Sequence, residues 1–203
     1  MKLNRIILFF ISTLISGNGF GQSVEVVPYF GYLFSSNLNT LDGEIKIDNG
    51  VNYGIIFDVR YEKDVIIEIM YNRLDTEVTI IEELFDTVKS AFNVSIQYFQ
   101  GGAQFEMEKG KFRPFAAFTL GVTLFNPTIN GINSDWRFSF TAGGGIKYYF
   151  LNDIGIRLQW RFLIPVYFSS GALFCGNEGC GAVISGSALL LQYDLTAGLV
   201  VVL

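Results

Sequence analysis

Histidine is absent from this chain of 203 residues. Without an imidazole, the chain cannot build Ser-His-Asp or Cys-His catalytic groups, histidine-containing zinc sites or the usual proton shuttle near neutral pH. Catalysis by carboxylates alone is left, and no motif supports it. The sequence therefore predicts a protein that is not an enzyme and that uses no metal and no cofactor.

Long hydrophobic runs are also lacking, although 50% of the residues are hydrophobic. After a basic start, an apolar run of about ten residues (6–15) is followed by the small-x-small sequence at 19–21. A helix needs roughly 20 apolar residues to cross a bilayer, so an anchor is the weaker reading. We expect a cleavable secretory signal peptide over residues 1–21, with the mature chain beginning at Gln22.

Basic residues are few. Setting aside the two in the leader, 12 Lys and Arg of the 14 remain against 19 Asp and Glu, a formal net charge of −7. Nucleic-acid binding requires a basic footprint, so we expect no nucleic-acid partner. The glycines at 101–102 and 143–145 lack the Lys-Ser/Thr that completes a phosphate loop. They lie inside alternating runs, where glycine relieves crowding or bends a strand.

Apolar residues are spread through the rest of the chain by strict alternation, which is typical of strands with two different faces. In the clearest segment, residues 154–164, every even position is bulky and apolar, whereas Arg157, Gln159 and Arg161 lie between them. In the segment 187–203 almost all odd positions are apolar, and Asp194 lies on the polar face. A strand with one hydrophobic and one polar face requires a different environment on each side.

Short and long polar segments alternate along the chain. Short turns at 62–64, 108–111 and 151–153 alternate with longer segments at 35–50, 79–90, 126–135 and 169–186. The short turns recur about every 45 residues, but a propeller blade of that length packs four short strands, and only two long ones fit here. Eight strands are predicted. In the fourth strand, the apolar residues lie at even positions up to Tyr98 and at odd positions after it. This change predicts a β-bulge near Tyr98.

Two closed architectures share this alternation. A water-soluble barrel or sandwich packs its apolar faces inward, whereas a membrane barrel turns them toward lipid. The interior of an eight-stranded barrel is only just wide enough for side chains, and here the polar faces carry Gly, Ser, Thr and Gln while Trp, Phe, Tyr and Leu fill the opposite faces. We therefore predict an all-β fold: a transmembrane antiparallel up-and-down barrel of eight strands, spanning residues 22–203. Closure is required because an open edge in lipid leaves backbone amides unpaired.

The leader, the strands, the turn pattern and the last strand together resemble the small OmpA/OmpX-type outer-membrane barrels and, more loosely, the PorT-like family. The resemblance implies the outer membrane of a Gram-negative bacterium, contact with its lipid and lipopolysaccharide, and assembly by the barrel assembly machinery. It also implies a terminal signal of the form polar-x-Gly-x-x-apolar-x-apolar. Four residues match it in place, although the family usually ends in an aromatic residue: Thr196, Gly198, Val201 and Leu203.

Charges of both signs lie on the predicted polar faces. A buried charge costs several kcal/mol unless it is paired and hydrogen-bonded. We therefore expect an ion-pair plug in the lower and middle lumen, and the alternative is a gate or narrow ion path through the same residues. The predicted cluster comprises Asp58, Arg60, Glu68, Lys147, Arg157, Arg161 and Asp194.

Two of the long loops carry further signals. Residues 76–81 continue the strand alternation, whereas Ile81, Leu84, Phe85 and Val88 have helical spacing. The second loop is thus either a pair of protruding strands or a short amphipathic helix. A protruding sheet edge can recruit a partner strand through backbone hydrogen bonds.

The fourth loop contains both cysteines, Cys175 and Cys180, separated by Gly-Asn-Glu-Gly. The two glycines permit a tight return, and an oxidising compartment favours a disulfide. Metal binding by two cysteines is the weaker reading.

The functional expectation is an integral outer-membrane barrel with a plugged polar lumen, which supports the envelope or presents loops to a surface partner. A narrow passive channel for ions or small solutes is the first alternative. A lipid-modifying enzyme is a distant alternative from a different class.

Overall fold

The computed structural model describes residues 23–35, 38–40, 43–82, 87–107, 110–128, 134–168, 171–176, 179–184, 187–189 and 191–203. The predicted signal peptide, residues 1–21, lies outside these ranges. Among the described residues, no helix is long and apolar enough to cross a membrane.

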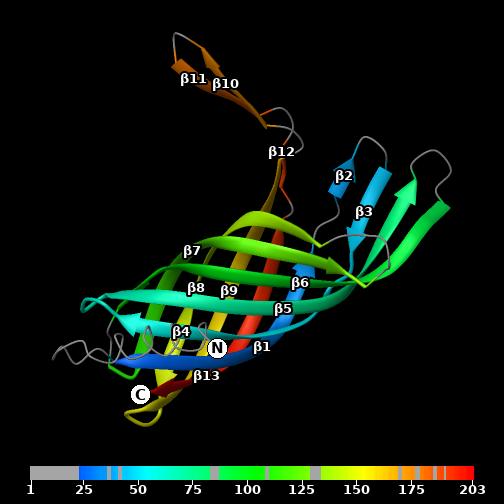
Figure 1. The fold of residues 1–203 in the computed structure, drawn as a ribbon. Helices are drawn as coiled ribbons and strands as arrows, with labels where there is room; N and C mark the ends of the chain where they lie inside the picture. Colours follow the sequence, from blue (N-terminus) through cyan, green and yellow to red (C-terminus); the bar gives the residue numbers. More distant parts are fainter. Residues whose placement is uncertain are drawn as a thin grey trace, which may run out of the picture.

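Eight long strands form the wall of a closed barrel (Figure 1). Each is antiparallel to its neighbours, and β1 pairs with β13 to close the ring. The predicted fold class is therefore confirmed. The wall consists of β1 (Val24–Ser35), β4 (Gly50–Arg60), β5 (Val65–Glu82), β6 (Thr87–Glu106), β7 (Phe112–Pro127), β8 (Asp135–Tyr149), β9 (Ile154–Phe168) and β13 (Gln192–Val202).

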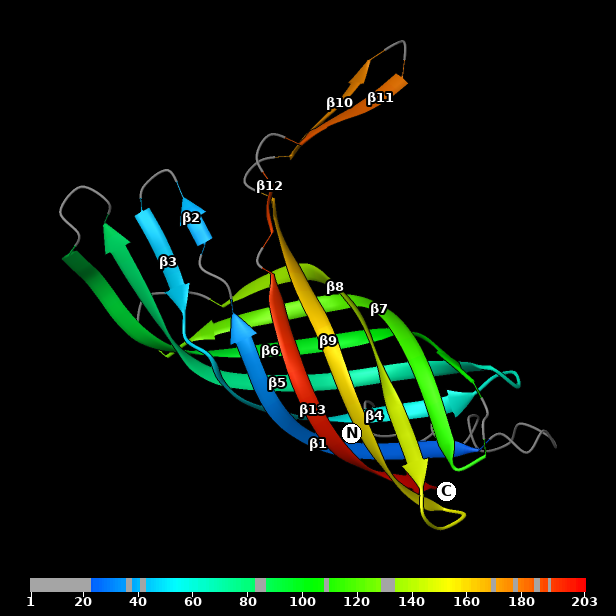
Figure 2. The ribbon, with the colours of Figure 1, turned by 180° about the vertical axis from the view of Figure 1, so that it is seen from behind.

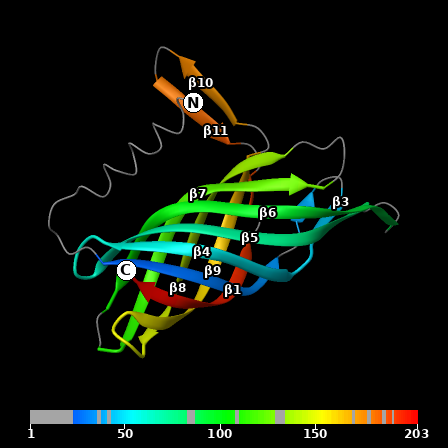
Figure 3. The ribbon, with the colours of Figure 1, turned by 60° about the horizontal axis from the view of Figure 1, so that its bottom comes forward.

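The two ends of the barrel differ, as the turn pattern predicts. Strands β4 and β5 are joined by a short turn, and so are β8 and β9, at the end that we call the turn end. The beginning of β1 and the end of β13 also lie there, where Glu25 is opposite Val202 (Figure 3). The opposite end, the loop end, carries the long connections (Figure 2).

Bulky apolar side chains point out of the barrel. Trp160, Phe138 and Leu191 are 49, 48 and 44% exposed, respectively, on the outer surface. Arg157 and Arg161, of opposite parity on β9, are buried inside. The inside-out arrangement that follows from the alternation is therefore present: the wall offers an apolar surface to lipid and encloses its charged residues.

The β-bulge predicted near Tyr98 is wrong. Tyr98 pairs with Asn72 and Phe99 with Tyr71 in one unbroken register, and the register between β5 and β6 shifts instead between Ile80 and Ile81. The side chains of β6 alternate without interruption through this region. Tyr98 and the apolar residues of the same parity before it point into the lumen, not toward lipid. The prediction failed because it assumed a lumen that is polar along its whole length.

Shorter strands lie in the long connections. The first contains β2 (Leu38–Thr40) and β3 (Gly43–Ile47), and the fourth contains the hairpin of β10 (Gly171–Gly176) and β11 (Gly179–Ile184). The predicted last strand is divided into β12 (Ser187–Leu189) and β13. Both pieces pair with β9 in the same register, so the interruption is local.

Candidate functional site

The turn end of the lumen is organised around Lys147 of β8. Its Nζ lies 2.6 Å from Glu25 Oε2, 2.8 Å from Asp58 Oδ2 and 3.2 Å from Glu106 Oε2. Alternation along β8 turns this side chain inward, where it is fully buried. Three carboxylates from β1, β4 and β6 thus surround one ammonium group, which donates hydrogen bonds to Glu25 and Asp58 and forms an ion pair with Glu106.

Arg157 lies beside Lys147, on the side toward the middle of the lumen. On β9 it is the cross-strand neighbour of Lys147, which places two positive charges side by side. The arrangement is stable because Arg157 donates to Asp58 Oδ2 at 2.9 Å and to Glu68 Oε2 at 2.7 Å. Its guanidinium also stacks over the ring of Phe115, 4.3 Å from the centroid.

The remaining members of this cluster lie nearer the turn end. Arg60 Nη2 donates to Glu106 Oε1 at 2.8 Å, and Arg113 Nη1 lies 3.4 Å from the same oxygen. Tyr149 donates its hydroxyl to Glu25 Oε1 at 2.8 Å. The turn-end cluster therefore contains four acids and four bases, with no net formal charge: Glu25, Asp58, Glu68, Glu106, Arg60, Arg113, Lys147 and Arg157.

Arg161 and Asp194 form a separate pair in the middle of the lumen. They are cross-strand neighbours on β9 and β13, and two hydrogen bonds join them, Nε to Oδ1 at 3.0 Å and Nη2 to Oδ2 at 2.5 Å. Asn52 also donates to Asp194. Arg161 stacks over Tyr29, which lies against Gly54; a Cβ at Gly54 would be only 2.6 Å from the Tyr29 hydroxyl.

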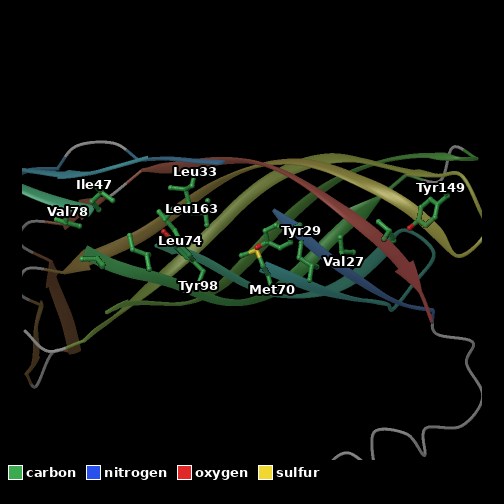
Figure 4. Close-up of a cluster of buried hydrophobic side chains, with 14 residues drawn as sticks. Val27, Tyr29, Leu33, Ile47, Met70, Leu74, Val78, Tyr98, Tyr149 and Leu163 are labelled. Atoms are coloured by element: carbon green, nitrogen blue, oxygen red, sulfur yellow. The ribbon is translucent and has the colours of Figure 1, made fainter. Parts of the chain in front are cut away.

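Buried apolar side chains run along the lumen from Tyr149 at the turn end to Val78 at the loop end (Figure 4). Leu33, Leu74, Ile96 and Leu163 are fully buried toward the loop end, and Tyr98 donates its hydroxyl to Gln192. The expectation of a polar lumen thus holds only in part for this upper region, where apolar and polar side chains are mixed and Leu163 is the cross-strand neighbour of Gln192. Inward positions can carry apolar side chains because strands from all sides of a narrow barrel bring them into contact with one another.

The structure brings the predicted charged residues together, although not as a single cluster. Asp58, Glu68, Lys147 and Arg157 meet, with Arg60 at their edge, while Arg161 and Asp194 pair above them. Sequence reasoning missed Glu25, Glu106 and Arg113. A signal was available, because the predicted set contained four bases and three acids, and an excess charge inside a barrel requires a further counter-ion.

The residues matching the terminal assembly signal lie between the middle of β13 and the residue just after it. Thr196 points inward, Gly198 lies opposite Tyr29, and Leu203 is exposed. The N–H of Leu203 donates to the carbonyl of Val24 at 2.8 Å, so the chain end closes onto β1. The fourth matching residue is Val201. Recognition of these four residues by the barrel assembly machinery stays a prediction.

Cys175 and Cys180 lie opposite each other in the β10–β11 hairpin. Their side chains are outside the described part of the structure, so the disulfide stays a prediction. Within the described ranges, no three acidic or cysteine side chains are grouped so that they could hold a metal ion.

A small sheet stands above the barrel at the loop end. Strands β5 and β6 continue past the end of β7, and β3 pairs with the extension of β5, from Ile47 opposite Val78 to Glu44 opposite Ile81. Strand β2 pairs with β3. We call this set, β2, β3 and the upper parts of β5 and β6, the loop-end sheet (Figure 2). The protruding-strand reading of the second loop is correct for residues 76–82 and 87–90, and 83–86 lie outside the description.

One edge of the loop-end sheet has no neighbouring strand in the described chain. Strand β7 ends at Pro127, opposite Val94, and the last backbone bond on that side runs from Thr128 N–H to Asn93 C=O at 2.9 Å. Above Asn93, the described part of β6 pairs only with β5. Within the described residues, the backbone groups of β6 above Asn93 that point away from β5 thus face no other strand, which is the property of an edge strand.

Comparison with known proteins agrees with this geometry. OprG from Pseudomonas aeruginosa superposes with a TM-score of 0.60 at 11% identity, over 92% of this chain and 98% of that chain. Neisserial surface protein A superposes with a TM-score of 0.56 at 12% identity, over 91% of this chain and 99% of that chain. AlkL, whose structure was solved in lipid bilayers, superposes with a TM-score of 0.54 at 12% identity, over 93% of each chain. At such identities the likeness is one of fold. No curated protein matches the chain.

A family match extends over most of the sequence. Residues 17–176 match the outer membrane protein beta-barrel domain. This region contains the wall strands from β1 to β9, and the inside-out alternation and closed ring agree with it. The chain thus belongs to the outer membrane protein beta-barrel domain family, and its place is the outer membrane of a Gram-negative bacterium.

Proposed function

We propose that this protein is a plugged outer-membrane barrel that holds the loop-end sheet outside the cell and binds a surface partner by strand addition to β6. The observation that carries the proposal is the upper edge of β6, which projects beyond the end of β7 and has no neighbouring strand in the part of the chain that the structure describes. Because the long loops of such barrels are extracellular, this edge faces the medium.

The side of β6 that a partner meets can be deduced from the hydrogen bonds. Asn93 directs its carbonyl toward Thr128, on the β7 side. In an antiparallel strand the N–H and C=O of one residue point the same way and alternate along the strand. Ala91, two residues further, therefore presents its N–H and C=O to the outside, and an added strand would continue the ladder at this residue.

The filled lumen supports this reading over a channel. A balanced cluster of eight charged side chains fills the turn end, and buried apolar and uncharged polar side chains fill the loop end. Opening a water path would break several buried ion pairs, each of which costs several kcal/mol to separate. The barrel therefore acts as a rigid support, and the loop-end sheet is the part that contacts a partner.

A peptide selection tests the strand-addition mode. The barrel is embedded in lipid nanodiscs, a phage-displayed library of short linear peptides is panned against it, and the enriched peptides are measured by biolayer interferometry. Ala91→Pro removes the outward N–H donor, and we expect it to weaken binding by about tenfold or more. Ala91→Ser keeps the donor and should bind like the unmodified protein. Equal binding to both variants would exclude strand addition at this edge.

A further inference from the structure

A polar hollow of about 670 Å³ lies on the outer wall where β7 ends. Its lining comes from three adjacent strands, with Pro127 and Thr128 at the point where β7 leaves the wall. The polar side chains that the argument uses are Arg73, Asp75 and Glu77 of β5, Asn93 and Ser95 of β6, and Asn126 of β7.

The hollow begins at the boundary between the apolar and polar parts of the outer surface. Outward positions of β5 run from Ile67 and Ile69 through Tyr71 to Arg73 and Asp75. On β6 they run from Phe99 to Gln97, the cross-strand neighbour of Arg73. Since lipid contacts the apolar belt and the loop end is extracellular, the hollow faces the headgroups of the outer leaflet.

Aromatic rings lie directly below the hollow. Tyr71 and Phe99 are 5.0 Å apart between ring centroids, and Phe99 and Trp136 are 6.1 Å apart. The Tyr71 hydroxyl donates to Gln97 at 3.1 Å, at the lower rim. The surface therefore has two adjoining halves, a row of aromatic rings at membrane depth and a polar hollow just above it.

The charges of the hollow select against anions. Asp75 holds Arg73 through hydrogen bonds of 3.1 Å from Nε and 2.9 Å from Nη2, so this guanidinium is already neutralised. Glu77 adds a second carboxylate, which gives the lining a formal charge of −1. A phosphate would be repelled, whereas a hydroxyl group can donate to the carboxylates and accept from arginine and amide N–H groups.

We propose that the hollow binds the uncharged sugar headgroup of a glycolipid in the outer leaflet. Its acyl chains would lie along the row formed by Tyr71, Phe99 and Trp136. A lipid-linked sugar satisfies both halves of the surface, whereas a soluble sugar contacts only the polar half. This site does not depend on strand addition at β6, since its lining lies at and below Asn93.

Native mass spectrometry tests the proposal. The barrel is reconstituted in phosphatidylcholine nanodiscs containing equal small fractions of a galactosyl diacylglycerol and of phosphatidylglycerol, and the lipids that stay bound after mild release are counted. We expect the galactolipid to be retained in preference to both phospholipids. Asn126→Trp fills the hollow and should lower its retention about tenfold. Leu191→Trp places the same ring on the outer face of the wall near β13, where retention should be unchanged.

A second variant, Arg73→Gln, removes the charged donor without adding bulk and should lower galactolipid retention several-fold. Folding of each variant is checked by its heat-dependent migration on gels. Three results would overturn the proposal: equal retention of phosphatidylglycerol, retention that Asn126→Trp leaves unchanged, or displacement of the galactolipid by free methyl galactoside at comparable concentration.

Discussion

The pair Arg161–Asp194 offers a quantitative test of the inside-out barrel. Both side chains are buried, and Asp194 has only Arg161 and Asn52 as hydrogen-bond donors among the described contacts. Arg161→Met keeps most of the side-chain volume and leaves Asp194 charged in a space closed to water. Loss of one partner from a buried pair costs about 3–5 kcal/mol. We expect this loss in the free energy of unfolding.

The double variant Arg161→Met, Asp194→Asn separates the charge effect from packing. It removes the orphaned charge and keeps an acceptor for Asn52, so we expect it to recover about 2 kcal/mol or more of the loss. Arg73→Met is the matched control, because Arg73 and Asp75 form a similar pair on the outer surface with exposed fractions of 37 and 51%. An exposed pair contributes only about 0–1 kcal/mol.

Urea unfolding in lipid vesicles, followed by tryptophan fluorescence, measures all four proteins under the same conditions. The reasoning is refuted if Arg161→Met costs no more than the surface control, because the lumen would then be hydrated. It is also refuted if the double variant is less stable than Arg161→Met, since removing the orphaned carboxylate must help when that carboxylate is buried.

Three further predictions follow from the same structure. In planar bilayers, the purified protein should give no steady openings, and sustained ohmic conductance would contradict the filled lumen. Gly54→Ala should lower the free energy of unfolding by about 1–3 kcal/mol, since its Cβ would lie 2.0 Å from the Tyr71 carbonyl oxygen; Gly101→Ala, whose nearest neighbour is 3.8 Å away, should have little effect. Alkylation with and without prior reduction should differ in mass if Cys175 and Cys180 are bridged, and an identical mass would exclude the disulfide.

The upper lumen shows where sequence reasoning reached its limit. Val94, Ile96 and Tyr98 are apolar, and alternation alone assigned them to the lipid side of β6. The register with β5 places them inside instead. Periodicity tells which residues share a face, but not which face is which when both environments accept apolar side chains. Only contacts with Leu74 and Leu163, from other strands, decided the question.

The partners of the buried charges were likewise beyond the sequence. Lys147 meets Glu25 from 122 residues away and Asp58 from 89 residues away. Alternation placed Lys147, Asp58 and Arg157 on inward faces, as the structure has them. It also gave their approximate heights, in the lower and middle lumen, but not which side chains meet, because strand register depends on the pairing of every neighbouring strand.

The sequence by itself determined the strands, their alternating faces and the two kinds of connection, since a period of two residues and the turn residues are local properties of the chain. The groups that meet inside the lumen, the apolar side chains in its upper part and the projection of β6 beyond β7 were decided by tertiary structure. Each of these depends on which strands pair and in what register, and those choices join residues that are far apart in the sequence.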